Sequence, residues 1–204
     1  TTTYQYDGAG RQVLSRDHWN NETRYQYDNN SHLIKQSVHA LDGTIQQQQS
    51  WSYDSTGKLI GKTGAAGQLT QYSYDKNSNL IATTDAKSQL TNTDFDALNR
   101  PIATHYPDAG IVDKVYDKQN NLISVTDAEG HTTYYRYNGL GQRIETESPE
   151  TGITSYSYDQ AGNRINEIRA NGKNINYQYD ALNRVITASD SSGSSITYLY
   201  DSCA

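Results

Sequence analysis

Ten pairs of an aromatic residue followed by Asp or Asn recur along the chain and place an oxygen ligand at regular intervals. The aromatic members are Tyr6, Tyr27, Tyr53, Tyr74, Phe95, Tyr116, Tyr137, Tyr158, Tyr179 and Tyr200. A calcium site gathers six to eight oxygen atoms at one point, whereas these carboxylates arrive singly. Asp is also a common first residue of tight turns, where it accepts hydrogen bonds from the backbone two residues on. We therefore expect the Asp residues to cap turns, and we predict no metal site.

Other chemically active residues form no known catalytic pattern. The five histidines are His18, His32, His39, His105 and His131, and none lies in a His-Glu-x-x-His motif. No Gly-x-Ser-x-Gly elbow or glycine-rich phosphate loop occurs. The single cysteine, Cys203, cannot form an internal disulfide. The sequence predicts a protein that is not an enzyme and holds no cofactor.

Composition excludes further classes of function. The net charge is −6 and basic residues are scattered, so no nucleic-acid-binding stripe is present. No apolar run is long enough to span a membrane. Hydrophobic residues make up only 34%, which would suit a disordered chain. The chain nevertheless holds 18 Tyr and only 3 Pro, and Tyr buries a large ring while its hydroxyl stays hydrogen-bonded, so we expect an ordered structure.

The spacing of the aromatic pairs defines a repeat. It is 21 residues in eight of the nine intervals, and 26 between Tyr27 and Tyr53. The longer interval indicates a five-residue insertion in the connection 41–49, with a protruding polar loop at 46–49. Since fixed periods are typical of repeat arrays, we expect residues 1–204 to form one array of about ten repeats without a separate domain.

Each repeat alternates in the manner of a β-strand up to its aromatic residue. A second aromatic residue usually stands two positions earlier and a β-branched residue four positions earlier, with polar residues between them. Asp-x-x-Gly or Asp-x-x-Asn follows, as at 54–57 and 96–99, and predicts a type I turn with a G1 bulge.

A second strand follows the turn, and its marker is a β-branched residue seven positions after the aromatic one. This column contains Val13, Ile34, Ile60, Ile81, Ile102, Ile123, Ile144, Ile165 and Ile186. We expect it to form the core of the array. A second turn then begins at Asp17, Asp85, Asp127 or Asp190, and one residue later at 107–110 and 149–152. The predicted fold is all-β: about twenty strands in tandem 21-residue hairpins, forming a long, twisted antiparallel sheet.

The two aromatic columns leave two interpretations open. Their rings could pack between neighbouring hairpins, or they could form an exposed row that stacks on sugar rings. The first suits a scaffold, and the second suits a cell-surface adhesion module that binds carbohydrate or protein through its tyrosine-rich face.

The repeat resembles the YD repeats of RHS (rearrangement hotspot) proteins, including the bacterial polymorphic toxins. Residues 53–60 and 126–137 carry the motif most clearly. The resemblance implies a β-strip that coils as part of a hollow shell around a C-terminal toxin in the same polypeptide. It also implies a protein that is secreted, delivered by a bacterial secretion system or held at the cell surface. The self-cleaving region of that family has no match here. The array opens on a strand and stops after Tyr200-Asp201 without a polar cap, so we expect it to belong to a longer polypeptide or assembly.

Overall fold

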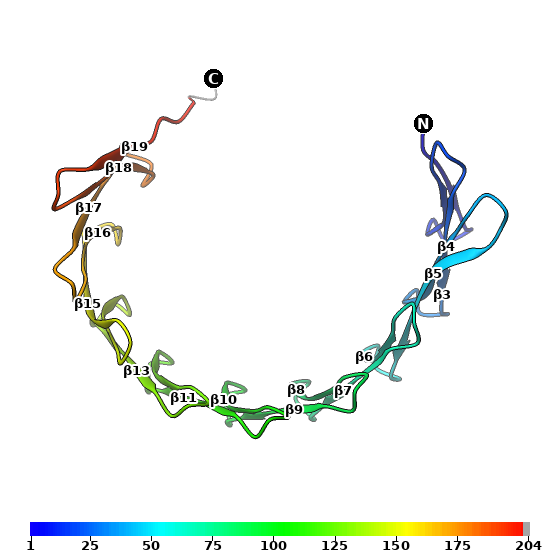
Figure 1. Ribbon diagram of the computed structural model, residues 1–204, viewed down its shortest axis with the longest axis horizontal. Helices are drawn as coiled ribbons and strands as arrows, with labels where there is room; N and C mark the ends of the chain where they lie inside the picture. The colour runs from blue at the N-terminus through cyan, green and yellow to red at the C-terminus, as the bar shows by residue number, and fades with distance from the viewer. Residues whose placement is uncertain (202–204) are drawn as a thin grey trace. The chain divides into compact units, whose positions relative to one another are not determined.

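A computed structural model describes residues 1–201, and in this part of the chain every regular element is a β-strand (Figure 1). Cys203, considered above as a lone thiol, lies outside the described residues. The chain divides into two compact units, Thr1–Ala109 and Gly110–Ala204. No helix in residues 1–201 has the length and apolar character needed to cross a membrane.

The first unit contains ten strands. They are β1 (Thr3–Tyr6), β2 (Gln12–Arg16), β3 (Glu22–Tyr27), β4 (Leu33–His39), β5 (Ile45–Tyr53), β6 (Leu59–Thr63), β7 (Leu69–Tyr74), β8 (Leu80–Thr84), β9 (Leu90–Phe95) and β10 (Pro101–His105). Each strand pairs antiparallel with the next one in the chain. The unit is therefore a run of hairpins in a single sheet layer.

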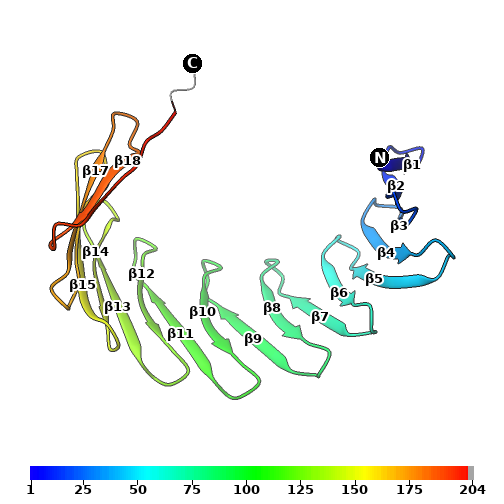
Figure 2. The ribbon, with the colours of Figure 1, turned by 45° about the horizontal axis from the view of Figure 1, so that its top comes forward.

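The second unit repeats this design with nine strands. They are β11 (Ile111–Tyr116), β12 (Leu122–Thr126), β13 (Thr132–Tyr137), β14 (Arg143–Ser148), β15 (Gly152–Tyr158), β16 (Arg164–Ile168), β17 (Asn174–Tyr179), β18 (Val185–Asp190) and β19 (Ser195–Thr197). Consecutive strands again pair antiparallel. Within each unit the ribbon is twisted, and turns line both of its edges (Figure 2).

The all-β hairpin prediction is confirmed, with nineteen strands in the described residues rather than twenty. The difference arises because the tenth aromatic pair, Tyr200-Asp201, ends the described part of the chain. The second strand of that hairpin would begin only after it.

The turn after each aromatic residue has the predicted geometry. The N–H of Gly10 donates to the Asp7 carbonyl at 3.0 Å, and the Asp7 N–H donates to the Arg11 carbonyl at 2.9 Å. Gly10 has φ 77°, as the G1 bulge requires. Ser31 and Ser78 occupy the same position with positive φ, so serine joins glycine and asparagine there.

One second turn lies in a different register from the prediction. We expected it at 107–110, but the Ala109 N–H donates to the Tyr106 carbonyl at 3.1 Å and Ala109 has φ 67°. The turn therefore starts at Tyr106, in line with the other second turns. The hairpin register decides this position, and it overrides the glycine at 110.

The Val/Ile column is not a buried core, and this prediction was wrong. No hydrophobic side chain among residues 1–201 is buried, and Ile60, Ile102, Ile144 and Ile165 are exposed. The physical reason is that a single sheet layer has no second layer to cover it.

The column marks a β-bulge instead. In the β11–β12 pair, Tyr116 lies opposite Leu122 and Val115 lies opposite Ser124, so Ile123 is the extra residue. The register shifts at the corresponding residue in each hairpin that contains a first and a second strand. A bulge bends its strand and increases the right-handed twist. The β-branched residue thus stands where the ribbon is twisted most.

The insertion also differs from the prediction. Residues 46–49 form no loop, because they belong to β5 and pair with β4, with Gln47 opposite Val38 and Gln49 opposite Gln36. The extra residues lengthen this hairpin, which closes on a turn from Ala40 to Gly43. Polar side chains suit a strand whose faces both contact solvent.

Candidate functional site

The hydroxyl of the repeat tyrosine ties a hairpin to the one before it in seven places. Tyr27 Oη donates to the Gln12 carbonyl at 2.9 Å, and Tyr74 Oη donates to the Leu59 carbonyl at 2.9 Å. The corresponding bonds run from Tyr53 to Leu33, Tyr137 to Leu122, Tyr158 to Arg143, Tyr179 to Arg164 and Tyr200 to Val185. In every case the acceptor is the residue six positions after the previous aromatic residue. We call this contact the tyrosine clasp.

The clasp lies where the backbone pairing between hairpins ends. β2 and β3 pair only from Leu14 opposite Arg24 to Arg16 opposite Glu22, so the ladder stops before Gln12 and Tyr27. The Tyr27 side chain therefore satisfies a carbonyl that the ladder leaves out. Partial burial of these rings raises the pKa of Tyr53, Tyr137 and Tyr179 by desolvation. The tyrosine hydroxyl thus makes a hydrogen bond that phenylalanine cannot make.

Phe95 is the one member of this aromatic column without a hydroxyl group. We therefore expect a tyrosine at this position to stabilise the array. Phe95→Tyr should let the new hydroxyl bond the Leu80 carbonyl, which is the equivalent acceptor. We expect the free energy of unfolding to rise by about 0.5–1.5 kcal/mol, the usual net value of a hydrogen bond. Urea denaturation followed by far-ultraviolet circular dichroism measures the change.

Tyr74→Phe is the matched control for this experiment. It removes the hydrogen bond to the Leu59 carbonyl and should lower the free energy of unfolding by a similar amount, about 0.5–1.5 kcal/mol. If Tyr74→Phe has no effect, the hydroxyls do not contribute to the cohesion of the array.

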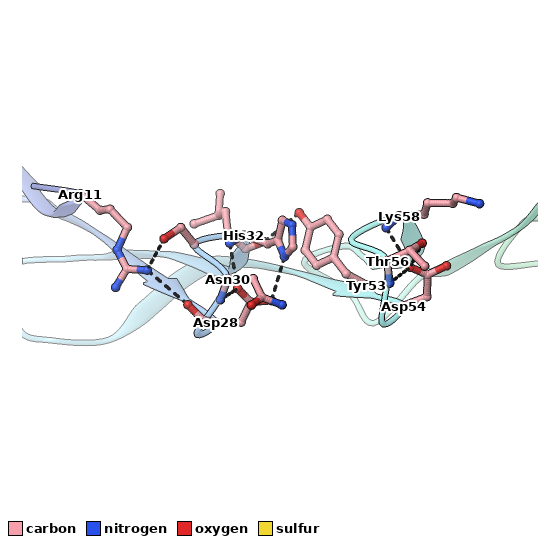
Figure 3. Close-up of polar contacts among 10 residues, drawn as sticks. Arg11, Asp28, Asn30, His32, Tyr53, Asp54, Thr56 and Lys58 are labelled. Carbon is pink, nitrogen blue, oxygen red and sulfur yellow. Dashed lines mark hydrogen bonds and ion pairs between the residues drawn. The ribbon is translucent and has the colours of Figure 1, made fainter. Parts of the chain in front are cut away.

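A second set of contacts runs along the turns (Figure 3). Five positions after each aromatic residue stands a side chain with an N–H donor. Arg11 Nε donates to Asp7 Oδ2 at 2.7 Å, and its Nη1 reaches the next turn at Asp28 O (3.2 Å) and Ser31 Oγ (3.0 Å). His32 Nδ1 lies 2.9 Å from Asp28 Oδ2, and its ring stacks on Tyr53 at 4.7 Å between centroids. We call this set the turn ladder.

The same ladder recurs with asparagine as the donor. Asn79 Nδ2 donates to Asp75 Oδ2 at 2.9 Å and to Asn99 Oδ1 in the next turn at 2.8 Å. Asn163 bridges to Asn183 in the same way at 2.8 Å. Each bridging side chain thus fixes its own turn and the following one, so the ladder sets the spacing between repeats.

The Asp carboxylates are held as anions by the turns that they cap. At Asp96 the Arg100 side chain is the main cause of a lowered pKa, followed by the Arg100 backbone N–H. At Asp54 the main causes are the Thr56 hydroxyl and the Lys58 N–H. Each carboxylate accepts from its own turn, and residues 1–201 contain no group of three His, Cys, Asp or Glu side chains placed to hold a metal ion. Turn capping is thus the observed role of these carboxylates.

Gly57 lies against His32 of the turn ladder, and we expect a side chain at this position to destabilise the array. Its φ is +85°, and a Cβ there would lie 2.9 Å from His32 Nε2. A left-handed conformation costs an L-residue about 1–2 kcal/mol, and the His32 ring must also move from Tyr53. We expect Gly57→Ala to lower the free energy of unfolding by about 2 kcal/mol, measured by urea denaturation.

Substitutions at two other glycines separate the cost of the left-handed backbone from the cost of the contact with His32. Gly10 has φ +77° with open space around its Cβ position, and Gly8 has open space and an ordinary φ. Gly10→Ala should therefore show the backbone cost alone, and Gly8→Ala should be close to neutral. Equal losses at Gly57 and Gly10 would contradict a role for the contact with His32.

The second unit adds a row of alternating arginine and tyrosine side chains. The Arg143 guanidinium carbon lies 5.6 Å from the Tyr135 ring centroid and 5.2 Å from that of Tyr156. Arg164 lies 5.5 Å from Tyr156 and 5.1 Å from Tyr177. All four distances suit cation–π attraction. Each of these rings packs against an arginine of its own hairpin, of the preceding hairpin or of both, which favours packing over sugar stacking for this aromatic column.

Glu167 completes this row. It is only 7% exposed, and its carboxylate pairs with Arg164 at 3.2 Å and Arg169 at 2.7 Å. Its hydrogen bond to Arg169 is the main reason for the raised pKa of that guanidinium. Glu167 is thus the most thoroughly enclosed charge in the described residues.

The chain is similar to known proteins over most of its length. The profile of the teneurin YD-shell family matches residues 26–204. The chain belongs to this family. A search of curated proteins gave no match. The RHS/YD identification is confirmed, and the shared role of the family is a structural one: the strip is part of a YD-shell.

Solved structures share the YD-shell fold. A TcdB2-TccC3-TEV crystal structure has 16% identity and a TM-score of 0.57 over 92% of this chain. A Tc holotoxin pore from Photorhabdus luminescens with a TccC3 mutation has 16% identity and a TM-score of 0.65 over 92% of this chain. A TcdB2-TccC3 crystal structure has 12% identity and a TM-score of 0.61 over 96% of this chain. This YD-shell chain spans only 13%, 12% and 16% of those chains.

The aromatic column and the capping Asp residues of the YD repeat were predictable from the sequence, whereas their hydrogen-bond partners were not predicted. The residue five positions after each aromatic one is Arg, His, Lys, Asn or Gln in every repeat, and this signal pointed to the turn ladder. The clasp acceptors are backbone carbonyls, which no residue type reveals. Arg143 and Arg164 stand out only because Leu, Val, Pro or Gln occupies their position elsewhere.

Proposed function

We propose that this strip forms part of the wall of a hollow shell that encloses a polypeptide cargo, in the manner of an RHS-type toxin. The observation that carries the proposal is the pair of repeating contacts between hairpins, the tyrosine clasp and the turn ladder. They join neighbouring hairpins, although no hydrophobic side chain among residues 1–201 is buried. A sheet held in this way serves as a thin wall. The strip itself has a non-catalytic role.

The partners follow from the same proposal. The strip would be continuous with a longer RHS polypeptide, and the cargo would be a C-terminal toxin domain of that polypeptide. The protein would be secreted or delivered by a bacterial secretion system. The similar solved chains are several times longer than this strip and include complexes of TcdB2 with TccC3, which supports a larger assembly.

Protease protection in the complete polypeptide tests the proposal. A protease added to the native protein should leave the C-terminal segment intact, and the same segment should be digested once urea has unfolded the array. Rapid digestion of that segment in the native protein would contradict encapsulation. Glu147→Ala, a change at an exposed ion pair, provides a control that should preserve the protection.

The carbohydrate-binding alternative has weaker support. The rings of Tyr135, Tyr156 and Tyr177 lie beside guanidinium groups, and the clasp engages the hydroxyls of the other column. A glycan array screened with the native chain distinguishes the two functions, because an adhesion module would bind a defined glycan set and a wall would bind none.

A further inference from the structure

Two consecutive repeats of the second unit place an arginine where most other repeats have an apolar residue. Arg143 and Arg164 each follow the previous aromatic residue by six positions. Both extend between tyrosines of adjacent hairpins, at 5.1–5.6 Å from the ring centroids. The two sites are therefore copies of one arrangement, and they can be compared position by position.

The copies differ in the residue that faces the arginine. In the second copy Glu167 lies opposite Tyr156 in the strand register, and its carboxylate is 3.2 Å from Arg164. In the first copy Thr146 lies opposite Tyr135 at the equivalent position. The Thr146 hydroxyl is buried and has no hydrogen-bond partner. The first copy thus lacks a carboxylate equivalent to Glu167, which neutralises the charge of Arg164 in the second copy.

Nearby carboxylates do not replace it. Glu145 and Glu147 pair with Arg136, at 3.2 Å and 3.8 Å. Arg136 projects from the other face of the sheet, because its neighbours Tyr135 and Tyr137 alternate with it along β13. Within residues 1–201, the Arg143 guanidinium has ring contacts but no ion pair. Its N–H donors face solvent, since Arg143 is exposed.

We propose that Arg143, between Tyr135 and Tyr156, binds an acidic side chain of a partner polypeptide. The Glu or Asp carboxylate of that partner would take the place that Glu167 has beside Arg164. Guanidinium and carboxylate form paired, charge-assisted hydrogen bonds, and the flanking rings hold the guanidinium in position. The proposal relies on the geometry of the second unit alone and does not require encapsulation.

The contacts of Tyr156 and Arg164 favour a peptide over an acidic sugar at this position. A sugar ring would need an open tyrosine face for stacking, and Tyr156 already contacts Arg143 and Arg164. The occupant of the equivalent position is itself an amino-acid carboxylate. An acidic sugar is therefore the outcome that would replace the proposal.

A fluorescein-labelled tetraglutamate peptide, titrated into the 204-residue chain at low salt, tests the site by anisotropy. Arg143→Leu introduces the residue that most other repeats have at this position, and it should weaken binding about tenfold or more. Thr146→Glu supplies an internal carboxylate, so it should weaken binding to a similar extent and raise the thermal midpoint. Glu167→Gln should add a second binding site at Arg164.

Arg136→Gln is the matched control, since it removes one positive charge from the opposite face and should leave the affinity within about twofold. Circular dichroism confirms that each variant is folded, and the Nε–Hε signal of Arg143 in the native chain reports binding without any mutation. The proposal is wrong if the native chain does not bind tetraglutamate or if Arg143→Leu binds it equally well. Tighter binding of trigalacturonate than of tetraglutamate would assign the site to an acidic sugar.

Discussion

Glu167→Ala is expected to lower the free energy of unfolding by about 2–3 kcal/mol, because hydrogen bonds to charged groups contribute most when they are shielded from water. The carboxylate is 7% exposed and bonds both Arg164 and Arg169. Its removal leaves Arg164 between two tyrosine rings without its anion. Urea denaturation of the isolated chain measures the loss.

Glu147→Ala gives the matched comparison. The Glu147 side chain is 47% exposed and lies 3.8 Å from Arg136, so its removal should cost less than about 0.5 kcal/mol, as exposed ion pairs usually do. If both variants lose the same free energy of unfolding, burial of Glu167 in the arginine–tyrosine row does not strengthen its ion pairs.

Acid is expected to unfold the array, because protonation of the turn-capping Asp carboxylates weakens the hydrogen bonds that they accept. Eleven turn carboxyls have a lowered pKa: Asp7, Asp17, Asp28, Asp42, Asp54, Asp75, Asp96, Asp127, Asp159, Asp180 and Asp190. In the unfolded chain each returns to about 3.9. The unfolded state therefore binds protons first, and the stability that these carboxylates contribute is complete above about pH 4 and declines as the pH falls through the folded values.

Thermal unfolding between about pH 6 and pH 2, followed by circular dichroism, measures this decline. Asp159→Asn is the matched variant, because Asn138 already caps the preceding turn of this type by accepting from the N–H groups of Leu140 and Gln142, each at 3.0 Å. Asp159 contacts Asn163 and no histidine. The protonation of a histidine therefore does not overlap with the protonation of this carboxylate. The variant should show a smaller dependence on pH than the native chain. A thermal midpoint that stays constant down to pH 2 would contradict the role of the carboxylates.

The strands and turns were predictable from the sequence because their causes are local. Alternation around Tyr135 and Tyr137 specifies a strand, and Asp-x-x-Gly specifies the turn that follows. The insertion shows the limit of this reasoning. Residues 46–49 are polar, as a loop would be, yet they pair with β4, because a polar strand is stable in a sheet whose two faces are solvated.

The repeating aromatic-Asp pair, its period and its capping chemistry were determined by the sequence alone. Only the tertiary structure decided which carbonyl accepts from the tyrosine hydroxyl and that the Val/Ile residue forms a β-bulge. It also decided that Arg143, unlike Arg164, has no carboxylate beside it among residues 1–201. The physical reason is distance along the chain. Tyr27 meets Gln12, and Asn79 meets Asn99, only after the register of the strands between them is set. The constancy of the Val/Ile column had suggested burial, whereas a single sheet layer buries no such residue, and the column marks the point where the strand bends.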